Sequence, residues 1–437
     1  MEHLMIDKKK VRYRMKQRNI RSQNELAKIM GITKNELSLI LSDKFDPVKK
    51  NINLLCSILD VKFSDIIRDN VQEEMDLYRC IKGWKVAGHG EEYLDVQHNI
   101  IMPEREYNVL ELFAGAGGLA LGLEEAGFNA VGLVEIDKYC CETLKGNKPN
   151  WNVIDEDVIT VANNGIRNYI GDAEVDLLSG GYPCQSFSYA GKKMGLDDTR
   201  GTMFYYYAEI LKQVRPKMFL AENVKGLVSH DGGKTLKTML NVFGEIGYNV
   251  EYKVLNAVNY GVAQKRQRVV IIGVRNDLTN VKFKYPKIFD FIPTLRDALR
   301  DVPPSEGIEY SQKKKKVLSM VPPGEYWRSL PDEVARDYMG KSYFSGGGRT
   351  GMARRISWDE PCLTLTCSPA QKQTERCHPD EVRPFTVREY ARIQSFPDTW
   401  NFSGSVGQKY KQIGNAVPVN FAKAIGLCIV NALNMLY

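Results

Sequence analysis

The 437-residue sequence predicts an α/β protein that joins a mostly parallel sheet, a smaller irregular domain and an all-α N-terminal domain. From residue 108 onwards, short β-rich runs alternate with helical periods, which is typical of a parallel sheet with helices on both faces. Residues 275–380 lose this alternation and are rich in Pro, Gly and charge. Residues 1–75 contain only short helical periods. The length agrees with two or three domains.

The charge distribution indicates a polyanionic partner for the N-terminal domain. The chain has 60 Lys and Arg against 53 Asp and Glu, a net charge of +7. Residues 1–50 hold 13 basic and 6 acidic residues, so the whole excess lies there. A basic N-terminal segment followed by a chain of balanced charge is typical of a protein in which one small module binds nucleic acid.

Several classes of protein are excluded by composition. No apolar run approaches the ~20 residues that a membrane helix needs, and no signal-peptide core is present, so we expect a cytoplasmic protein without a membrane partner. The nine cysteines have no regular spacing and form no paired CxxC sets, which argues against disulfides and against a metal site. Cys140, Cys141 and Cys428 are expected to be buried as small hydrophobes.

The first 75 residues have the pattern of a helix-turn-helix domain. A basic helix is predicted over 8–18, and Ser22 can cap a second helix with Glu25 as its capping-box partner. Gly31-Ile32-Thr33 breaks the chain before a third helix over 34–41, and a further helix is predicted over 52–59.

This arrangement resembles the repressor-like helix-turn-helix family. The resemblance places Lys34, Asn35 and Ser38 on the side that faces a DNA groove. The alternative is a small helical docking bundle. We favour DNA binding because the charge excess lies here.

A glycine-rich turn follows the strand predicted over 109–113. The turn, Gly115-Ala116-Gly117-Gly118, lets the backbone approach a ligand, and the helix after it offers N–H groups to an anion. Its G-x-G-G spacing differs from the dinucleotide fingerprint, which argues against a nicotinamide oxidoreductase. Glu135 ends the next strand and Asp157 follows the third, so both suit a nucleoside ligand. Either carboxylate alone could equally be a helix cap.

A second group of polar residues follows later strands. The strand predicted over 175–178 leads through a Gly-Gly pair to Cys184 on an accessible loop, and the next strand ends at Glu222. Arg266 and Arg268 alternate at the start of the last strand, which puts them on one face. Because ligands collect at the carboxyl ends of parallel strands, a thiol, a carboxylate and two guanidinium groups are expected to converge on one pocket.

Six motifs in order resemble those of the DNA (cytosine-5)-methyltransferase family, over about residues 108–437. They are Phe113-Ala-Gly-Ala-Gly-Gly, Pro183-Cys184-Gln185, Glu222-Asn223-Val224, Gln264-x-Arg266-x-Arg268, the run from Arg388-Glu389 to Gln394-Ser-Phe-Pro397, and Gln412-Ile-Gly414-Asn415-Ala-Val-Pro418.

The resemblance implies a Rossmann-like sheet that binds S-adenosylmethionine, with no metal. Phe113 and the glycine turn would hold its adenosyl and methionine parts, Glu135 its ribose and Asp157 its adenine. Asn415 and the last helix would close the pocket by packing beside the first strand. The full set implied to contact the cofactor is Phe113, Gly115, Gly117, Glu135, Ile136, Asp157, Val158, Pro183, Asn415 and Ala416.

The chemistry follows from the cytosine ring, whose carbon 5 is a poor nucleophile while the ring is aromatic. Addition of the Cys184 thiolate at carbon 6 makes carbon 5 nucleophilic. A protonated Glu222 beside ring nitrogen 3 would neutralise the developing charge, and Arg268, with Arg266 beside it, would hold the base carbonyl. The base that removes the carbon 5 proton is not identified. A base inside a duplex must first be flipped out, and the loop after Pro183, with Gln185 and Ser188, would contact that DNA.

Residues 276–382 occupy the place of the family's target-recognition domain. Residues 275–380 hold 18 basic and 14 acidic residues. Arg349, Arg354 and Arg355 follow a glycine run and are candidates for reading bases, because Arg is the commonest partner of guanine edges. Phosphate contact or surface solubility is the alternative for each. The domains expected are 1–75, a linker over 76–106, 107–275 and 383–437 as the catalytic domain, and 276–382.

The resemblance implies the modification enzyme of a restriction–modification system, acting on duplex DNA beside a companion restriction endonuclease. We expect a monomer in catalysis, with dimerisation on operator DNA as an option if residues 1–75 repress the protein's own operon. Extra non-specific affinity for DNA is the other role open to residues 1–75. The alternatives for the whole chain are a tRNA cytosine-5 methyltransferase and a transcriptional regulator with secondary methyltransferase activity.

Overall fold

The computed structural model describes residues 8–18, 20, 22–41, 52–59, 93–183, 199, 202–344 and 350–437. The chain divides into two compact units, Met1–Glu92 and Tyr93–Tyr437. The linker expected over 76–106 therefore ends earlier than predicted. Its last part belongs to the second unit because Leu94 N donates to Tyr285 O (3.0 Å) and Lys287 N donates to Leu94 O (2.8 Å).

The described part of the first unit consists of short helices, as predicted. They are α1 (Lys8–Gln17), α2 (Gln23–Ile29), α3 (Lys34–Ile40) and α4 (Ile52–Leu59). The side chain of Ser22 caps α2 by accepting from Glu25 N (3.2 Å). Thr33 and Glu36 bond each other's backbone amides at the start of α3, which is a capping box. Apolar side chains from all four helices form one buried cluster, which includes Val11, Met15, Leu26, Leu37, Ile40, Leu55 and Leu59.

The second unit is built on a seven-stranded sheet of order β3-β2-β1-β4-β5-β8-β6. The first five strands in this order are parallel, whereas β8 is antiparallel to both β5 and β6. The sequence missed β6 because its residues YNVEYKVLN lie at the sheet edge and are mostly half-exposed. The strands are β1 (Tyr107–Leu112), β2 (Phe128–Glu135), β3 (Val153–Asp155), β4 (Leu177–Gly180), β5 (Met218–Val224), β6 (Tyr248–Asn256) and β8 (Gln267–Arg275).

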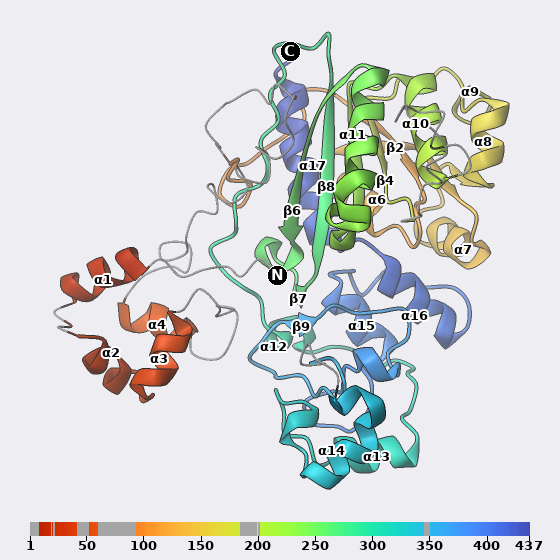
Figure 1. The fold of residues 1–437 in the computed structure, drawn as a ribbon. Helices are drawn as coiled ribbons and strands as arrows, with labels where there is room; N and C mark the ends of the chain where they lie inside the picture. Colours follow the sequence, from red (N-terminus) through yellow and green to blue (C-terminus); the bar gives the residue numbers. More distant parts are fainter. Residues whose placement is uncertain are drawn as a thin grey trace. The chain divides into compact units, whose positions relative to one another are not determined.

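Helices cover both faces of this sheet, as predicted (Figure 1). On one face, α8 (Val158–Asn164), α10 (Met203–Val214) and α11 (Lys234–Ile246) share a core with the strands. On the other face, α6 (Gly118–Glu125) and α17 (Val419–Asn434) share a second core. These two helices touch closely, since a Cβ at Gly122 would lie 2.4 Å from Val419 O. The C-terminal helix therefore packs beside the first strand.

One stretch, Val406–Asn434, is long and apolar enough to cross a membrane by length and composition alone. It consists of α16 (Val406–Asn415) and α17, separated by a break at Ala416–Pro418. Because 72% of its apolar window is buried inside the protein, the stretch belongs to the protein core.

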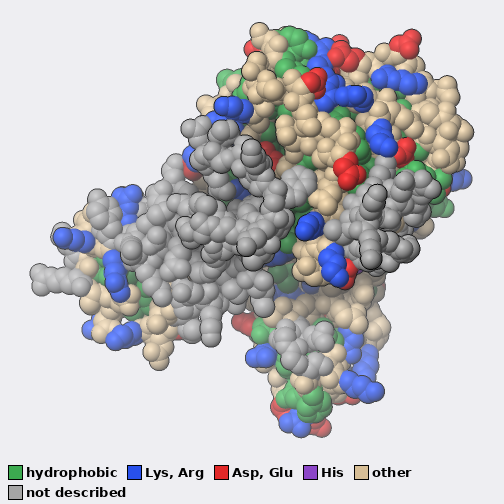
Figure 2. Space-filling model, turned by 45° about the horizontal axis from the view of Figure 1, so that its top comes forward, with side chains coloured by type: hydrophobic (Ala, Val, Ile, Leu, Met, Phe, Trp, Pro, Cys, Tyr) green, Lys and Arg blue, Asp and Glu red, His purple; other side chains and the backbone are tan. Residues whose placement is uncertain are grey.

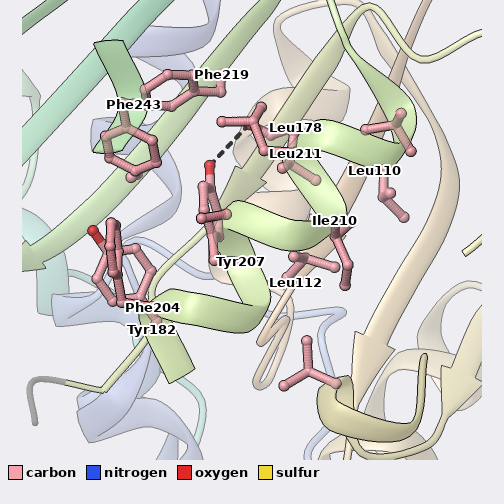
Figure 3. Packing of buried hydrophobic residues seen from close by; sticks show 14 of the residues in the cluster. Leu110, Leu112, Leu178, Tyr182, Phe204, Tyr207, Ile210, Leu211, Phe219 and Phe243 are labelled. Atoms are coloured by element: carbon pink, nitrogen blue, oxygen red, sulfur yellow. Dashed lines mark hydrogen bonds between the residues drawn. The ribbon is translucent and has the colours of Figure 1, made fainter. Parts of the chain in front are cut away.

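The turn after β4 rests on an aromatic cluster (Figure 3). Tyr182 is buried, and its ring lies 5.6 Å from Phe204 and 5.3 Å from Tyr207. The Tyr207 hydroxyl donates to Leu178 O at 3.3 Å, which joins α10 to β4. The cluster anchors the backbone immediately before Pro183.

A smaller lobe of low regularity, here residues 310–382, has its own core, whereas Leu295 and Leu299 of the predicted span 276–382 pack with residues 385–419. It meets the rest of the unit through β7 (Gln264–Lys265), which pairs in parallel with β9 (Cys362–Leu363). Figure 1 shows this pair between the sheet and the lobe. The remaining helices are α7 (Lys138–Asn147), α9 (Arg167–Ile170), α12 (Leu295–Leu299), α13 (Gln312–Leu318), α14 (Asp332–Met339) and α15 (Val387–Ile393), with 3-10 turns at Lys225–Val228, His230–Gly233, Ala257–Tyr260, Trp327–Ser329, Gly340–Phe344 and Lys372–Thr374.

Candidate active site

Glu222 lies directly against the turn that leads to Cys184. A Cβ built on Gly181 would come within 2.8 Å of Glu222 Oε2, so the carboxylate occupies the space that a side chain there would need. Asn223 Nδ2 donates to Tyr182 O at 2.8 Å and ties the two strand ends together. The structure thus brings the end of β5 and the approach to Cys184 into one site.

Arg268 faces this carboxylate across the antiparallel pair of β5 and β8. Its Nε lies 2.7 Å from Glu222 Oε1, and both side chains are 13% exposed. Glu222 Oε1 nevertheless has no aligned hydrogen bond among the described residues, although it is buried. The hydrogen-bonding capacity of this buried oxygen is therefore not fully used by the described residues.

Arg266 does not share this arrangement, although the alternating pattern predicted that it would. It falls between β7 and β8 and is 2% exposed. Its Nη1 donates to Leu365 O (3.2 Å) and its Nη2 to Gly414 O (3.0 Å). Burial and the neighbouring Arg268 lower the pKa of Arg266 to about 9, so it stays charged at neutral pH.

The glycine turn after β1 meets the end of β2. Glu135 Oε2 accepts from Gly115 N (2.7 Å), and Oε1 accepts from Ile136 N (2.9 Å) and Asp137 N (2.8 Å). Gly115 has φ +54°, and a Cβ there would meet nothing within 4 Å. Phe113 also has a positive φ (59°), which is strained for a residue with a side chain. The turn is thus an open, strained cradle beside a carboxylate.

The neighbouring strand ends add further groups to this edge. Asp157 caps α8 by accepting from Ile159 N at 2.9 Å, so it does act as the helix cap that the sequence left open as an alternative. Ile136 is 65% exposed, an unusual position for a large apolar side chain, whereas Val158 is buried and Pro183 is exposed. Since β3, β2, β1 and β4 are neighbours in the sheet, these residues share its carboxyl edge.

The C-terminal segment closes against this edge. Asn415 is exposed and accepts from Cys367 Sγ at 2.8 Å, whereas Ala416 is buried. Trp400 Nε1 donates to Ala116 O (3.1 Å) and holds the glycine turn from outside. The whole segment around 400–416 therefore supports the glycine turn. The resemblance had implied a role at the cofactor pocket only for Asn415 and the last helix.

The arginines expected to read DNA differ from one another. Arg355 is 9% exposed, and its guanidinium donates to the carbonyls of Val321, His378, Pro379 and Asp380. This geometry holds the small lobe together and leaves Arg355 poorly placed to read a base. The Arg354 side chain is 15% exposed, and its Nε has no partner among the described residues. Cys184, Gln185, Ser188 and Arg349 lie outside the described residues.

The helix-turn-helix unit presents a basic surface (Figure 2). Lys34, Asn35 and Ser38 are all exposed on α3, as are Arg12 and Lys16 on α1. A hollow of about 670 Å³ lies in this unit, and it is lined by Arg12, Met15, Lys16, Ile20, Ser22, Gln23, Asn24 and Lys34.

The described cysteines other than Cys56 and Cys367 are buried. Cys140, Cys141 and Cys428 are buried, as predicted. Burial raises the pKa of Cys141 to about 12, so its thiol is unreactive at neutral pH.

Sequence reasoning missed the polar side chains that brace the site. Gln264, Gln394 and Gln412 are all buried. Gln264 Nε2 donates to Gln394 Oε1 (2.9 Å), and Gln412 accepts from Thr143 Oγ1 (2.7 Å). The sequence carried a signal for these residues, because each glutamine stands in one of the six motifs. The motifs do not show, however, which residue each glutamine side chain bonds.

Residues 107–431 match the model of the C-5 cytosine-specific DNA methylase family. The chain belongs to that family. Residues 10–72 of the methylase also match the Cro/C1-type helix-turn-helix DNA-binding domain.

Named relatives extend over the same regions. The methylase is 54% identical over 434 residues to the Type II methyltransferase M.Sau96I of Staphylococcus aureus, covering 99% of each chain. It is 56% identical over 337 residues to M.Eco47II of Escherichia coli, covering 75% of this chain and 80% of that protein. A crystal structure of a candidate DNA modification methyltransferase encoded within an E. coli prophage has a TM-score of 0.56 and 25% identity, covering 75% of this chain and all of the other.

Proposed function

We propose that the protein transfers a methyl group from S-adenosylmethionine to carbon 5 of a flipped-out cytosine in a specific duplex DNA sequence. We further propose that it is the Type II modification enzyme of a restriction–modification system in the cytoplasm. The observation that carries the catalytic proposal is the Glu222 carboxylate against Gly181, three residues before Cys184. The relatives named above are Type II methyltransferases, which supports the class.

The carboxyl edge of β3, β2, β1 and β4 fits the cofactor. Glu135 uses three of its roughly four acceptor sites on backbone amides, which leaves capacity for a ribose hydroxyl. The exposed Ile136 offers an apolar face to an adenine ring, and the open space at Gly115 admits the methionine part. The other proposed contacts are Phe113, Gly117, Asp157, Val158, Pro183, Asn415 and Ala416. When bound, S-adenosylmethionine supplies an electrophilic methyl group.

The protein's own groups activate the base. The Cys184 thiolate adds to carbon 6 of the cytosine, and the electron pair moves toward nitrogen 3 and carbon 5. Glu222, in its protonated form, donates to nitrogen 3 and neutralises that charge. Arg268 holds the base carbonyl. Its Nε lies 2.7 Å from the Glu222 carboxylate, so a base that Glu222 contacts is also within reach of Arg268. Once carbon 5 carries the methyl group, transfer of its proton to a base expels Cys184 as the thiolate and restores the aromatic ring.

The small lobe is proposed to read the target. Arg349 and Arg354 are the candidate base-reading residues, with Gln185 and Ser188 on the DNA side of the catalytic loop. The buried guanidinium of Arg355 is left out of this proposal. The unit Met1–Glu92 is proposed to bind operator DNA and repress the protein's own operon, because its exposed cations cluster on a helix-turn-helix.

Sequencing methylated cytosines in DNA from cells that express the protein tests product and target together. We expect 5-methylcytosine at one short sequence. A Cys184→Ser variant should lose at least ~10³-fold in rate, and the wild-type enzyme should be trapped covalently on a 5-fluorocytosine duplex. Methylation at the normal rate by the serine variant would contradict the mechanism. Activity on tRNA in place of duplex DNA would favour the RNA alternative.

Operator binding has a separate test. Footprinting on the DNA upstream of the protein's own reading frame should show protection by the wild type. Lys34→Ala should weaken that protection at least ~10-fold while methylation of target DNA is unchanged. Equal footprints for both proteins would contradict the regulatory role.

A further inference from the structure

Arg266 lies where three distant segments of the chain meet. These segments are 264–266, 364–367 and 413–416, and we call their contacts the interlobe joint. The first leads into the catalytic strand β8, and the third carries Asn415 of the proposed cofactor pocket. The second lies in the small lobe by sequence and bonds to Thr374 and Arg376 there, but its Leu365 packs in the core shared with residues 385–419. A residue that bonds to all three can transmit displacement between them.

The guanidinium of Arg266 makes such bonds. Nη1 donates to Leu365 O (3.2 Å) on the small-lobe side, and Nη2 donates to Gly414 O (3.0 Å) on the cofactor side. Among the described residues, no carboxylate lies within ion-pair distance of it, and its buried Nε has no hydrogen-bond partner. A buried charge held only by carbonyl groups is costly, so its place calls for a functional reason.

Buried glutamines reinforce the same joint. Gln264 accepts from Leu365 N (3.0 Å) and donates to Gln394 Oε1 (2.9 Å). Gln394 Nε2 in turn donates to Ile413 O (2.6 Å) and Ala416 O (3.2 Å). The network leaves little room for one segment to move without the others, because each broken bond exposes a buried polar group.

The backbones also touch directly at this point. A Cβ on Gly414 would lie 2.6 Å from the carbonyl of Thr366, so residue 414 packs against the segment 364–367 without an intervening side chain. One residue further along each segment, Cys367 Sγ donates to Asn415 Oδ1 (2.8 Å). A shift of 364–367 thus acts on Asn415 through two adjacent contacts.

We propose that Arg266 is a positioning residue that couples DNA binding by the small lobe to cofactor binding at Asn415, and that it does not hold the flipped base. The proposal rests on the proposed function, because it needs DNA on the lobe and S-adenosylmethionine beside Asn415. When DNA orders the lobe, the Arg266 cross-link sets the Gly414 carbonyl and with it the Asn415 side chain.

Titration calorimetry with S-adenosylhomocysteine tests the coupling without turnover. The dissociation constant is measured with and without a duplex that the wild type methylates. We expect DNA to tighten wild-type binding at least ~5-fold, within the usual range of coupling between sites. Arg266→Met and Arg266→Lys should reduce this factor below ~2-fold, while DNA affinity alone changes by less than ~3-fold.

Arg355 provides a matched control. It is 9% exposed, and its guanidinium donates to Val321 O (3.2 Å), Pro379 O (2.9 Å) and Asp380 O (2.8 Å), which lie within the small lobe and outside the interlobe joint. Arg355→Met therefore removes a buried arginine without touching the joint. It should lower the melting temperature as Arg266→Met does but keep the coupling factor of the wild type.

Two outcomes would overturn the proposal. One is a coupling factor in the Arg266 variants within ~2-fold of wild type, and the other is an equal loss in Arg355→Met. Cys367→Ala, at an exposed position, keeps the test valid if the Arg266 variants do not fold. It should at least halve the coupling factor, and an unchanged factor would also overturn the proposal. Failure of the wild type to bind S-adenosylhomocysteine at all would instead contradict the proposed function.

Discussion

At the scale of single residues, Gly181 decides how closely Glu222 can approach the turn before Cys184. The Glu222 Oε2 atom lies where a side chain at 181 would begin. The flexibility of glycine is not what matters here, since Gly181 does not have a positive φ. The absence of a Cβ is what lets the Glu222 carboxylate lie against the turn after β4.

Gly181→Ala should therefore impair catalysis more than folding. A Cβ 2.8 Å from Glu222 Oε2 must displace the carboxylate, and a displacement of about 1 Å can cost ~100-fold in rate. We expect kcat for methyl transfer to fall at least ~10-fold, with a melting temperature close to that of the wild type.

Gly226→Ala is the control for this prediction. Gly226 follows β5 closely, and a Cβ there would meet nothing within 4 Å. Its kcat should stay within ~2-fold of the wild type. Equal rates for Gly181→Ala and Gly226→Ala would show that the Glu222 position is not critical.

For the arginines, residue type and spacing do not determine the role of each side chain. Arg268 meets a carboxylate in the site, whereas Arg266, two positions earlier, binds only carbonyl oxygens. Arg355 likewise donates to backbone carbonyls, although it follows a glycine-rich run. Which of these guanidinium groups is available to DNA depends on the segments packed around each.

At the scale of elements, the contact between α6 and α17 joins the glycine turn to the C-terminal segment. Two glycines of α6 permit it, since Cβ atoms at Gly118 and Gly122 would lie 2.1 and 2.4 Å from carbonyls of 417 and 419. The C-terminal helix therefore keeps Asn415 near the turn after β1.

Gly122→Ala should force these helices apart. We expect the free energy of unfolding to fall by ~1–3 kcal/mol, as for other overpacked cores, and cofactor affinity to fall with it. Gly146→Ala in α7 is the control, because a Cβ there would meet nothing within 4 Å. Alanine at 146 should raise the free energy of unfolding by ~0.5–1 kcal/mol, as helix propensity dictates. Urea denaturation measures both, and a stabilised Gly122→Ala would contradict the packing described.

The segment 378–383 joins the small lobe to α15 and contains a buried histidine. His378 is 5% exposed, and its Nδ1 accepts from Asp380 N and Glu381 N, both at 3.2 Å. Burial and the Arg383 guanidinium lower the pKa of His378. Protonation of Nδ1 would remove both acceptor bonds, so the folded protein favours the neutral ring.

The stability of the protein should consequently depend on pH through His378. The unfolded chain binds a proton at His378 near pH 6.5, whereas the folded chain does so only at lower pH. The free energy of unfolding should therefore fall as the pH drops below about 6.5. His378→Gln should show a shallower fall between pH 7 and pH 5 in thermal melts. Parallel curves for the two proteins would contradict this assignment.

At the scale of the whole molecule, the two units have separate cores. The first unit is held by residues between Val11 and Leu59, whereas the sheet cores draw on residues after 93. The match to M.Eco47II covers 337 residues, or 75% of this chain. The catalytic part is therefore expected to fold without the helix-turn-helix unit.

Removal of residues 1–92 tests this separation. The shortened protein should methylate its target sequence with kcat within ~3-fold of the full chain, because no residue of the proposed site is lost. It should lose protection of the upstream DNA in footprints. A shortened protein that folds, by circular dichroism, but cannot methylate DNA would mean that the first unit serves catalysis.

The sequence by itself determined the class of fold, most strands and helices, and the motifs at the sheet edge. These features are local: alternation of apolar residues sets strands and helices, and glycine turns and polar residues at strand ends mark the edge. Four of the helices in the first unit and the capping of α2 by Ser22 were likewise predictable from short-range pattern.

Only the tertiary structure decided which polar side chains face the site and which hold it together. Arg266, Gln264, Gln394 and Gly414 meet across more than 100 residues of intervening chain, and their hydrogen bonds are fixed by packing of the small lobe against the C-terminal segment. The antiparallel edge strand β6 also escaped prediction, because its half-exposed residues carry no strong period. Contacts between residues far apart in the chain leave no local signal in the sequence. Such contacts decide that Arg268 pairs with Glu222 in the site, whereas Arg266 is buried in the interlobe joint.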